Sequence, residues 1–447
     1  MYKNKILIFC FFLIGVLQAQ EKEMSLSMKQ AVDYAIKNNY SNKVALNDIE
    51  AAKQRKWETT TIGLPQISGK VDYKNWLKQQ ISLLPGEIAG GAPGTFVPVT
   101  FGTQQTMDAS VTLNQLLFDG SYLVGLQSAK TYLKISEQAK EKTELATREA
   151  VINAYGNVLV AQERINILKE NKKTVDRQLR GAKEGFKEGL TEEETIEQFE
   201  ITQGNIISQQ RNADRNKVIA YQMLNLSLGN PINTKLNLTD SLDDLVVTNT
   251  DLNLLTKTFD LEKHIDLRIA ENDRESKRLL MKLEKSKYLP TLSAFVNYGA
   301  NANSDSFTFT NGDQKWFDYS LLGVSLNVPI FSSFGKKAKV KQATIALESA
   351  DIRLAEIKQK LSLQAEQAQS NYELSIANYE TAKKNLALAT RIERKQKIKF
   401  DEGVTTSIDL LATRNQLYSQ QNNYLQSILN IIANKAKLEN ALNISIK

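Results

Sequence analysis

The sequence has few of the residues that end helices and few that build reactive sites. Its 447 residues include 7 prolines, 21 glycines, one cysteine and one histidine. A single histidine excludes a His-based metal site and a pair of catalytic histidines, and we expect His264 to be an exposed residue at a helix start. The patterns GxxxxGK[ST] and GxSxG are both missing. We therefore predict that the chain is not an enzyme and that it binds no metal and no cofactor.

Long apolar runs are also missing. Beyond the N-terminus no apolar stretch reaches about 18 residues, so we predict no membrane-spanning helix. Residues 1–19 have the basic start, short apolar core and small final residue of a secretory signal peptide, with cleavage after Ala19. Cys10 lies in that core, so the mature chain has no thiol for a disulfide. The excess of basic over acidic residues, 57 against 50, is too small and too dispersed to indicate nucleic-acid binding.

What the sequence does contain is long helical periodicity. The stretch from Tyr122 to Phe186 has no proline, and its apolar and small residues recur on one helical stripe, for example Val151, Tyr155 and Val158. At about 1.5 Å per residue this helix is roughly 100 Å long. Taken alone, the stretch is also typical of an ordinary coiled-coil rod.

The chain contains the same unit twice. The turn glycines Gly189 and Gly403 are 214 residues apart, and the segments that end at Phe118 and Phe331, before the two long helices, are 213 apart. Each unit has the order helix, Leu-Pro, two alternating segments, long helix, glycine turn, helix. We divide the chain into a signal peptide (1–19), a first repeat (20–229), an inter-repeat segment (230–261) with a short strand or belt, and a second repeat (262–447).

The helices of the two repeats are expected to match in length. In the first repeat, helices over about 26–58 and 191–228 stack end to end beside the long one. In the second, helices over about 262–288 and 404–442 flank residues 336–401. Within 336–401 two seven-residue registers of small and apolar residues, one containing Leu361 and one containing Tyr372, indicate coiled-coil packing.

Four segments of about ten residues alternate with period two. Ile67, Val71 and Tyr73 alternate with polar residues, and the same pattern recurs over 107–114, 292–298 and 322–328, with Phe295 as an exception. Loops rich in polar residues, glycine or proline separate the members of each pair, at 77–106 and 301–315. Single strands of this kind also occur in half-buried sheets of soluble domains. Four of them in two matched hairpins favour a transmembrane β-barrel, because no other residues remain to cover the sheet.

Four strands cannot close a barrel, and open strand edges are not tolerated in lipid. The chain is therefore expected to oligomerise, and a homotrimer supplies 12 strands. The predicted fold class is mainly α with a transmembrane β part: an internally duplicated chain that forms an α-helical barrel plus a 12-stranded β-barrel.

In these features the chain resembles the TolC family of outer-membrane efflux ducts. The resemblance covers the whole mature chain and rests on the opening segment Leu26–Ala35, the Leu-Pro pairs at 64–65 and 289–290, the Phe-Asp-Gly at 118–120 and the two Glu-Gly turns. It implies a trimeric exit duct for efflux or type I secretion in the outer membrane, with a long periplasmic extension. It also implies a periplasmic adaptor and an inner-membrane RND or ABC pump as partners.

The resemblance implies three sets of functional residues. A pore constriction just after the turns matches Asp409; the equivalent place in the first repeat is Thr195, and Glu192, Glu193 and Glu194 could substitute, although acids there also stabilise a helix start. The hairpin ends that contact the adaptor contain Gly185, Gly189, Leu190, Thr191, Gly403, Val404 and Thr405. Polar strand residues that would line the barrel include Lys70, Asp72, Asp108, Thr112, Asn114, Asn297 and Asn327.

One alternative class is a periplasmic adaptor or another coiled-coil scaffold. Adaptors also contain long helical hairpins. They carry a single hairpin and compact β domains, however, rather than two hairpins joined to amphipathic strands. Recovery of the protein in outer-membrane fractions after an alkaline wash would separate the two classes.

Overall fold

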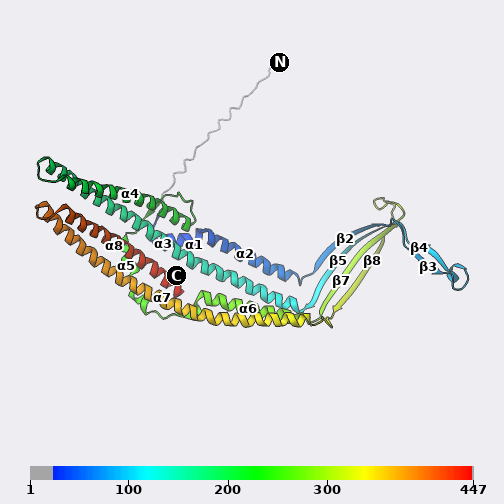
Figure 1. Ribbon diagram of the computed structural model, residues 1–447. Helices are drawn as coiled ribbons and strands as arrows, with labels where there is room; N and C mark the ends of the chain where they lie inside the picture. The colour runs from blue at the N-terminus through cyan, green and yellow to red at the C-terminus, as the bar shows by residue number, and fades with distance from the viewer. Residues whose placement is uncertain (1–23, 445–447) are drawn as a thin grey trace, which may run out of the picture. The chain divides into compact units, whose positions relative to one another are not determined.

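The computed structural model describes residues 24–444 (Figure 1). The predicted signal peptide lies outside them. The chain divides into two compact units, one of residues up to 45, 140–265 and from 359 onward, the other of residues 46–139 and 266–358. Among the described residues, no helix is both long enough and apolar enough to cross a membrane.

The second unit contains an antiparallel four-stranded sheet. Its strands are β2 (Gln66–Asn75), β5 (Gln105–Asp119), β7 (Thr291–Ser304) and β8 (Phe317–Asn327), in the order β2-β5-β7-β8 (Figure 1). Each repeat therefore supplies one pair, and the pairs join through β5 and β7. The strands β5 and β7 are 15 and 14 residues long, longer than expected, because β7 stays paired with β5 as far as Ser304. The prediction that residues 301–304 belong to a loop was wrong.

The predicted loop over 77–106 also contains strands. Within it, β3 (Ile81–Pro85) and β4 (Phe96–Thr100) form a separate antiparallel hairpin, joined through the short 3-10 helix η1 (Gly86–Ala89). The apolar residues of this segment favour paired strands, and Gly90 and Gly94 adopt the positive φ values of 78° and 81° that its turn requires. The glycines and prolines indicate only the turn, which is why the strands were missed.

Seven long or medium helices follow the predicted order. They are α1 (Met28–Asn38), α2 (Tyr40–Thr61), α3 (Gly120–Lys187), α4 (Glu193–Leu228), α6 (Ile265–Ser286), α7 (Gly335–Asp401) and α8 (Ser407–Ala441). The two longest, α3 and α7, have 68 and 67 residues, so each is about 100 Å long.

The first predicted helix, 26–58, is in fact a strand and two helices. Residues Met24–Leu26 form β1. The break between α1 and α2 occurs at Asn39, whose backbone is extended. Its side-chain amide donates to the carbonyl of Ser227 at 2.8 Å, and its Oδ1 accepts from the N–H of Ser41 at 2.8 Å. Asn39 therefore caps the start of α2 and ties it to the end of α4, a tertiary contact that helical periodicity does not reveal.

The inter-repeat segment contains the expected short strand and, in addition, short helices that were not predicted. It includes β6 (Leu236–Leu238), α5 (Leu242–Asn249) and the 3-10 helices η2 (Leu252–Thr256) and η3 (Leu261–Lys263). Strand β6 pairs in parallel with β1, so the start of the first repeat is bonded to the segment that follows it. This sheet lies entirely in the first unit.

The main core of the first unit lies where α3, α7 and α8 meet the inter-repeat segment. Both predicted registers of α7 contribute, because Tyr372 and Tyr379 of one register are buried in this core and Ala368 of the other packs against it. The two tyrosines Tyr155 and Tyr372, one in each repeat, are fully buried. Burial raises the pKa of each phenol above its ordinary value.

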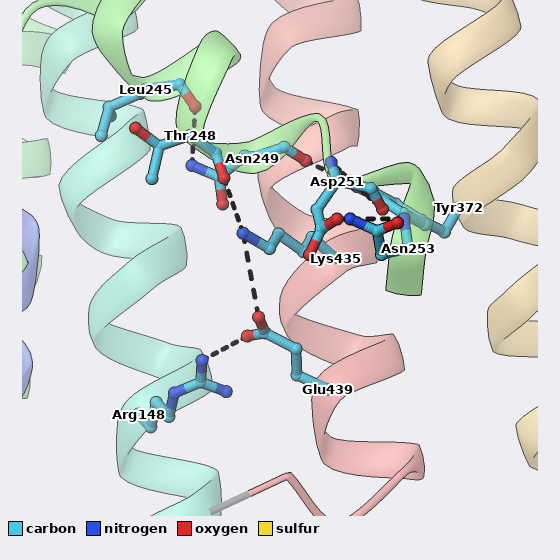
Figure 2. Close-up of polar contacts among 9 residues, drawn as sticks. All are labelled: Arg148, Leu245, Thr248, Asn249, Asp251, Asn253, Tyr372, Lys435 and Glu439. Atoms are coloured by element: carbon cyan, nitrogen blue, oxygen red, sulfur yellow. Dashed lines mark hydrogen bonds and ion pairs between the residues drawn. The ribbon is translucent and has the colours of Figure 1, made fainter. Parts of the chain in front are cut away.

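Each buried tyrosine bonds to the backbone of a nearby connecting segment. Tyr155 Oη donates to the carbonyl of Leu26 at 2.9 Å. Tyr372 Oη donates to the carbonyl of Asn249 at 2.7 Å and accepts from the N–H of Asp251 at 2.9 Å, as Figure 2 shows. The two hydroxyls thereby satisfy backbone groups that burial would otherwise leave without partners.

An ionic network joins the same segment to α3 and α8 (Figure 2). Arg148 forms an ion pair with Glu439, and Lys435 lies 3.8 Å from the other carboxylate oxygen of Glu439. Lys435 Nζ also donates to the carbonyl of Thr248 at 2.8 Å, at the end of α5. All three charged side chains are mostly buried, so each one depends on the others to offset its desolvation.

The prediction that His264 is exposed was wrong. His264 is 6% exposed and directly precedes α6. Its ring packs edge-on against Phe259, with 6.0 Å between ring centroids. The residue starts a helix as expected, but the 3-10 turns before it place the ring in the core.

Candidate functional sites at the hairpin ends and on the sheet

The two helical hairpins of the first unit, α3–α4 and α7–α8, end in the same turn. Gly189 and Gly403 both have φ of 72°. In each turn the glycine N–H donates three residues back, to Phe186 or Phe400, at 3.0 Å. The next N–H donates five residues back, at 2.8 Å in both turns. This is the Schellman motif, in which a left-handed residue satisfies the last carbonyls of a helix.

The residues after the turns differ between the repeats. Thr406 caps α8, and its hydroxyl accepts from the N–H of Asp409 at 3.2 Å and donates to Asp409 Oδ2 at 2.8 Å. Thr405 donates to the same oxygen at 3.0 Å. These two hydroxyls hold the pKa of Asp409 below its ordinary value. In the first repeat Glu192 occupies the capping position without a side-chain hydrogen bond.

Thr195 and Asp409 occupy equivalent positions, 214 residues apart, but their side chains form different hydrogen bonds. Asp409 is exposed and bonds within its own turn. Thr195 lies 3.3 Å from Ser407 through their hydroxyl oxygens, and Ser407 Oγ donates to Gln198 Oε1 at 2.9 Å. The first turns of α4 and α8 are thus linked directly, a contact that the sequence analysis did not anticipate.

An apolar cluster reinforces this link. Phe199 and Leu410 are fully buried, and Phe199 packs edge-on against Phe400 with ring centroids 6.1 Å apart. One aromatic ring of this pair comes from each hairpin. Phe400 follows the helical spacing of α7, so its place in a cluster at the hairpin ends is visible only in three dimensions.

A cavity of about 770 Å³ lies between the two hairpin ends. Both hairpins supply its walls, with polar side chains such as Gln178 and Thr405 prominent among them. Some of the expected residues line it and some do not. The expected residues that line it are Leu190, Thr191, Glu192, Glu194, Thr195, Gly403 and Thr405. Those outside the lining are Gly185, Gly189, Glu193, Val404 and Asp409.

The three glutamates Glu192, Glu193 and Glu194 are exposed around the first turn of α4. Their carboxylates lie near the positive end of the helix dipole, which favours them there. Glu194 also accepts from Gln198 Nε2 at 3.0 Å within the same helix. The turn residues Leu190 and Val404 are 83% and 74% exposed, so each hairpin presents an exposed apolar side chain at its turn.

A buried arginine that was not predicted from the sequence lies behind the turns. Arg414 of α8 is 1% exposed, and its Nε donates to Glu393 of α7 at 3.2 Å. Its two terminal nitrogens have no hydrogen-bond partner within residues 24–444. Burial of an arginine on a helix rich in polar residues leaves no pattern in the sequence, so no signal could have revealed it.

The seven expected polar strand residues share one face of the sheet. Lys70, Ser110 and Tyr319 stand on this face, as do Asp72 and Asp108, which are direct cross-strand partners. The face is bonded across strands: Tyr319 Oη donates to Asp108 at 2.9 Å, and Asn297 Nδ2 donates to Thr112 at 2.6 Å. Asn114 and Asn327, the remaining two of the seven, lie on the same face of the sheet.

The exception at Phe295 has a structural reason. Its ring lies on the polar face over Gly323, where an added Cβ would come within 2.3 Å of the ring. Tyr319 covers Gly299 in the same way, at 2.6 Å. Aromatic rings that cover cross-strand glycines stabilise a sheet at positions with no side chain of their own.

The opposite face is apolar and uncovered. Ile67, Val71, Val296, Leu322 and Val324 are between 46% and 74% exposed. The outer strands β2 and β8 each pair on one side only. Among the described residues, no group of three or more His, Cys, Asp or Glu side chains could hold a metal ion.

Comparisons with known proteins match this arrangement. TolC of Vibrio cholerae is 23% identical over 338 residues, which cover 75% of this chain and 76% of that protein. TolC of Escherichia coli is 21% identical over 342 residues, which cover 75% of this chain and 69% of that protein. The solved structure of CusC superposes with a TM-score of 0.73 at 14% identity, covering 93% of this chain and 92% of that one. The Campylobacter jejuni CmeC outer membrane channel superposes with a TM-score of 0.71 at 18% identity, covering 93% of this chain and 85% of that one.

The fold is therefore that of the outer-membrane channels, and the location is the outer membrane with a periplasmic extension. This result removes the periplasmic adaptor as an alternative. The model of the outer membrane efflux protein family matches residues 35–230 and 260–443, one stretch in each repeat. The chain belongs to the outer membrane efflux protein family.

Proposed function

We propose that the protein is a trimeric exit duct for efflux or type I secretion, opened by a periplasmic adaptor and an energised inner-membrane pump of the RND or ABC type. The observation that carries the proposal is the four-stranded sheet with one polar face, one exposed apolar face and two half-paired outer strands. Such a sheet is stable in lipid only when other copies complete it. Three copies give a barrel of 12 strands, a number known for closed barrels.

The polar face of the four-stranded sheet keeps the bore of the conduit hydrated. In the closed barrel, Lys70, Asp72, Asp108, Thr112 and Asn297 point into the bore and Leu322 and Val324 point into lipid. Side chains of both charge signs line such a bore, so it selects weakly among solutes. Asn114 and Asn327 extend the same lining toward the helices.

The hairpin ends form the closing point. Glu192, Glu193, Glu194, Thr195 and Asp409 lie there, and in a trimer each acid recurs three times around the axis. Like charges in a ring repel one another, attract cations and favour opening. The hydrogen bonds of Ser407 with Thr195 and Gln198 oppose that opening, because they join the two hairpins of one chain.

The adaptor contacts the hairpin turns. The exposed Leu190 and Val404 provide apolar contacts, and Gly185, Gly189, Thr191, Gly403 and Thr405 shape the surface around them. Engagement of both turns spreads α4 from α8 at the Ser407 link and widens the end of the duct. The cargo moves passively, and the pump supplies the energy.

The test of the closing point is the conductance of purified protein in planar bilayers. Asp409→Ala should lower the current at low divalent cation concentration and weaken block by divalent cations, because the ring that attracts cations and favours opening loses one carboxylate per subunit. Asp214→Ala, an exposed acid farther along α4, is the matched control and should leave both quantities unchanged. Unchanged current and unchanged block in the Asp409 variant would remove this residue from the gate.

A further inference from the structure

The connection between β8 and α7 carries an apolar and basic surface that the duct does not require. Just past the end of β8, Val328, Ile330 and Phe331 are 52%, 94% and 76% exposed. Phe334 is 70% exposed, and its ring packs edge-on against that of Phe331 at 5.9 Å. Directly after these rings, α7 begins with Lys336, Lys337, Lys339 and Lys341.

The backbone of this connection is strained. Ser333 and Phe334 have φ values of 48° and 61°, in the left-handed region that residues other than glycine rarely adopt. Two consecutive residues of this kind hold the phenyl ring of Phe334 outward next to Phe331. Strain of this kind persists where the surrounding structure depends on the position of the side chain.

The lysines divide into two groups. Lys336 serves the fold: its Nζ donates to the carbonyl of Lys287 at 2.6 Å and lies 5.6 Å from the ring centre of Tyr288. Lys337, Lys339 and Lys341 are exposed and form no ion pair within the described part of the chain. Lys337 and Lys341 lie four residues apart in α7 and therefore share one face of that helix.

In the first repeat, the corresponding connection between a strand and a long helix carries a negative charge instead of positive ones. There Asp119 caps α3, and its Oδ1 accepts from the N–H of Ser121 at 2.6 Å and from that of Tyr122 at 3.3 Å. The first turn of α7 has no acidic residue and holds lysines instead. Cations at a helix N-terminus are electrostatically unfavourable. The fold therefore gains nothing from Lys337, Lys339 and Lys341, and an anion outside the chain explains their position.

We propose that Phe331, Phe334, Lys337, Lys339 and Lys341, the basic–aromatic collar, bind the headgroup of an anionic phospholipid in the periplasmic leaflet of the outer membrane. The collar follows the helix-proximal end of β8, where the membrane boundary lies. Aromatic rings favour such a boundary. The Cα atoms of the lysines lie up to about 10 Å farther along α7, and their long side chains can extend back to a headgroup layer roughly 5–8 Å deep. Clusters of lysines beside a membrane segment bind anionic lipid.

This inference rests on the outer-membrane location and not on conduction, so it can fail while the duct proposal stands. The test is native mass spectrometry of the detergent-purified full-length protein, titrated with phosphatidylglycerol or phosphatidylcholine. We expect phosphatidylglycerol to bind preferentially. A variant with K337Q, K339Q and K341Q should bind it on the order of a hundredfold more weakly, at roughly fivefold per lysine. Bilayer conductance of this variant should be unchanged.

The matched control carries K384Q, K395Q and K399Q, three exposed lysines of the same helix far along α7, and should bind phosphatidylglycerol like the wild type. A variant with F331S and F334S should lose affinity for both lipids, which confirms the contribution of the rings. Equal binding of the two lipids by the wild type, or equal losses in the two lysine variants, would overturn the proposal. Glycerol phosphate that binds as tightly as the lipid would also overturn it, because the site would then recognise a free anion.

Discussion

At the scale of single residues, buried hydroxyls hold the repeats to the segments that connect them. Tyr155 and Tyr372 are 217 positions apart and perform the same task in the two repeats. Both appear in the sequence only as aromatic members of a helical stripe, which predicts a buried ring. The stripe cannot show that the hydroxyl of Tyr372 bonds the backbone at Asn249 and Asp251, because those partners come from a segment without periodicity.

Tyr372→Phe should destabilise the protein by about 1–3 kcal/mol. The change leaves a buried carbonyl and a buried N–H without their partner, and the cost of such unpaired groups has this size. Thermal unfolding of the purified protein measures it. Tyr418→Phe is the control, since Tyr418 is half-buried and its hydroxyl has no hydrogen bond among the described residues. Equal losses in the two variants would show that the Tyr372 bonds do not matter.

Asp409 gives a prediction of pH dependence. Its pKa in the folded state lies below the ordinary value of 3.8 because Thr406 and Thr405 donate to the carboxylate. A lowered folded-state pKa stabilises the protein above the unfolded value, and this stabilisation is lost as pH falls through the folded value. Below about pH 4 the wild type should therefore lose part of its stability advantage over Asp409→Asn, measured as the difference between their Tm values. A constant difference across the range would contradict this assignment.

At the scale of elements, helices were the easiest part to predict and strands within loops the hardest. Helices α3 and α7 begin and end within two residues of their expected bounds, because a long stripe and a turn glycine define them. The hairpin of β3 and β4 was missed, since only five residues form each strand. The alternation that predicted β2, β5, β7 and β8 also predicted which side chains share a face.

The hairpin ends could be predicted in part. The two glycine turns follow from the duplication of the sequence, and the choice of Asp409 follows from the resemblance to the TolC family. The spacing of three residues between Thr406 and Asp409 is also typical of a capping motif, so the start of α8 could have been predicted from it. The link from Thr195 to Ser407 joins residues 212 positions apart. Local patterns cannot show it, because it depends on how the two hairpins pack.

Gly403→Ala should destabilise the end of the α7–α8 hairpin by about 1–2 kcal/mol, because alanine is strained at the positive φ of this turn. Faster amide hydrogen exchange over residues 399–410 would report it. Gly204→Ala is a control of opposite sign: Gly204 lies within α4 with open space around it, so alanine there should raise helix stability by up to about 1 kcal/mol. If both changes slow exchange locally, the role assigned to the turn is wrong.

At the scale of the whole molecule, the chain is incomplete as a monomer. It has an apolar sheet face open to its surroundings and outer strands that pair on one side only. Membership of the outer membrane efflux protein family accounts for both features. The composition, with few breakers and no long apolar run, suits a chain that crosses the membrane as strands and the periplasm as helices.

The central claim is that several copies of this chain build one continuous water-filled conduit. The most direct measurement is the current through single molecules of the detergent-purified mature protein in a planar bilayer, with its mass determined in the same preparation. The account predicts the mass of a trimer and discrete ion currents. A water-soluble monomer that needs no detergent and adds no current to the bilayer would contradict it.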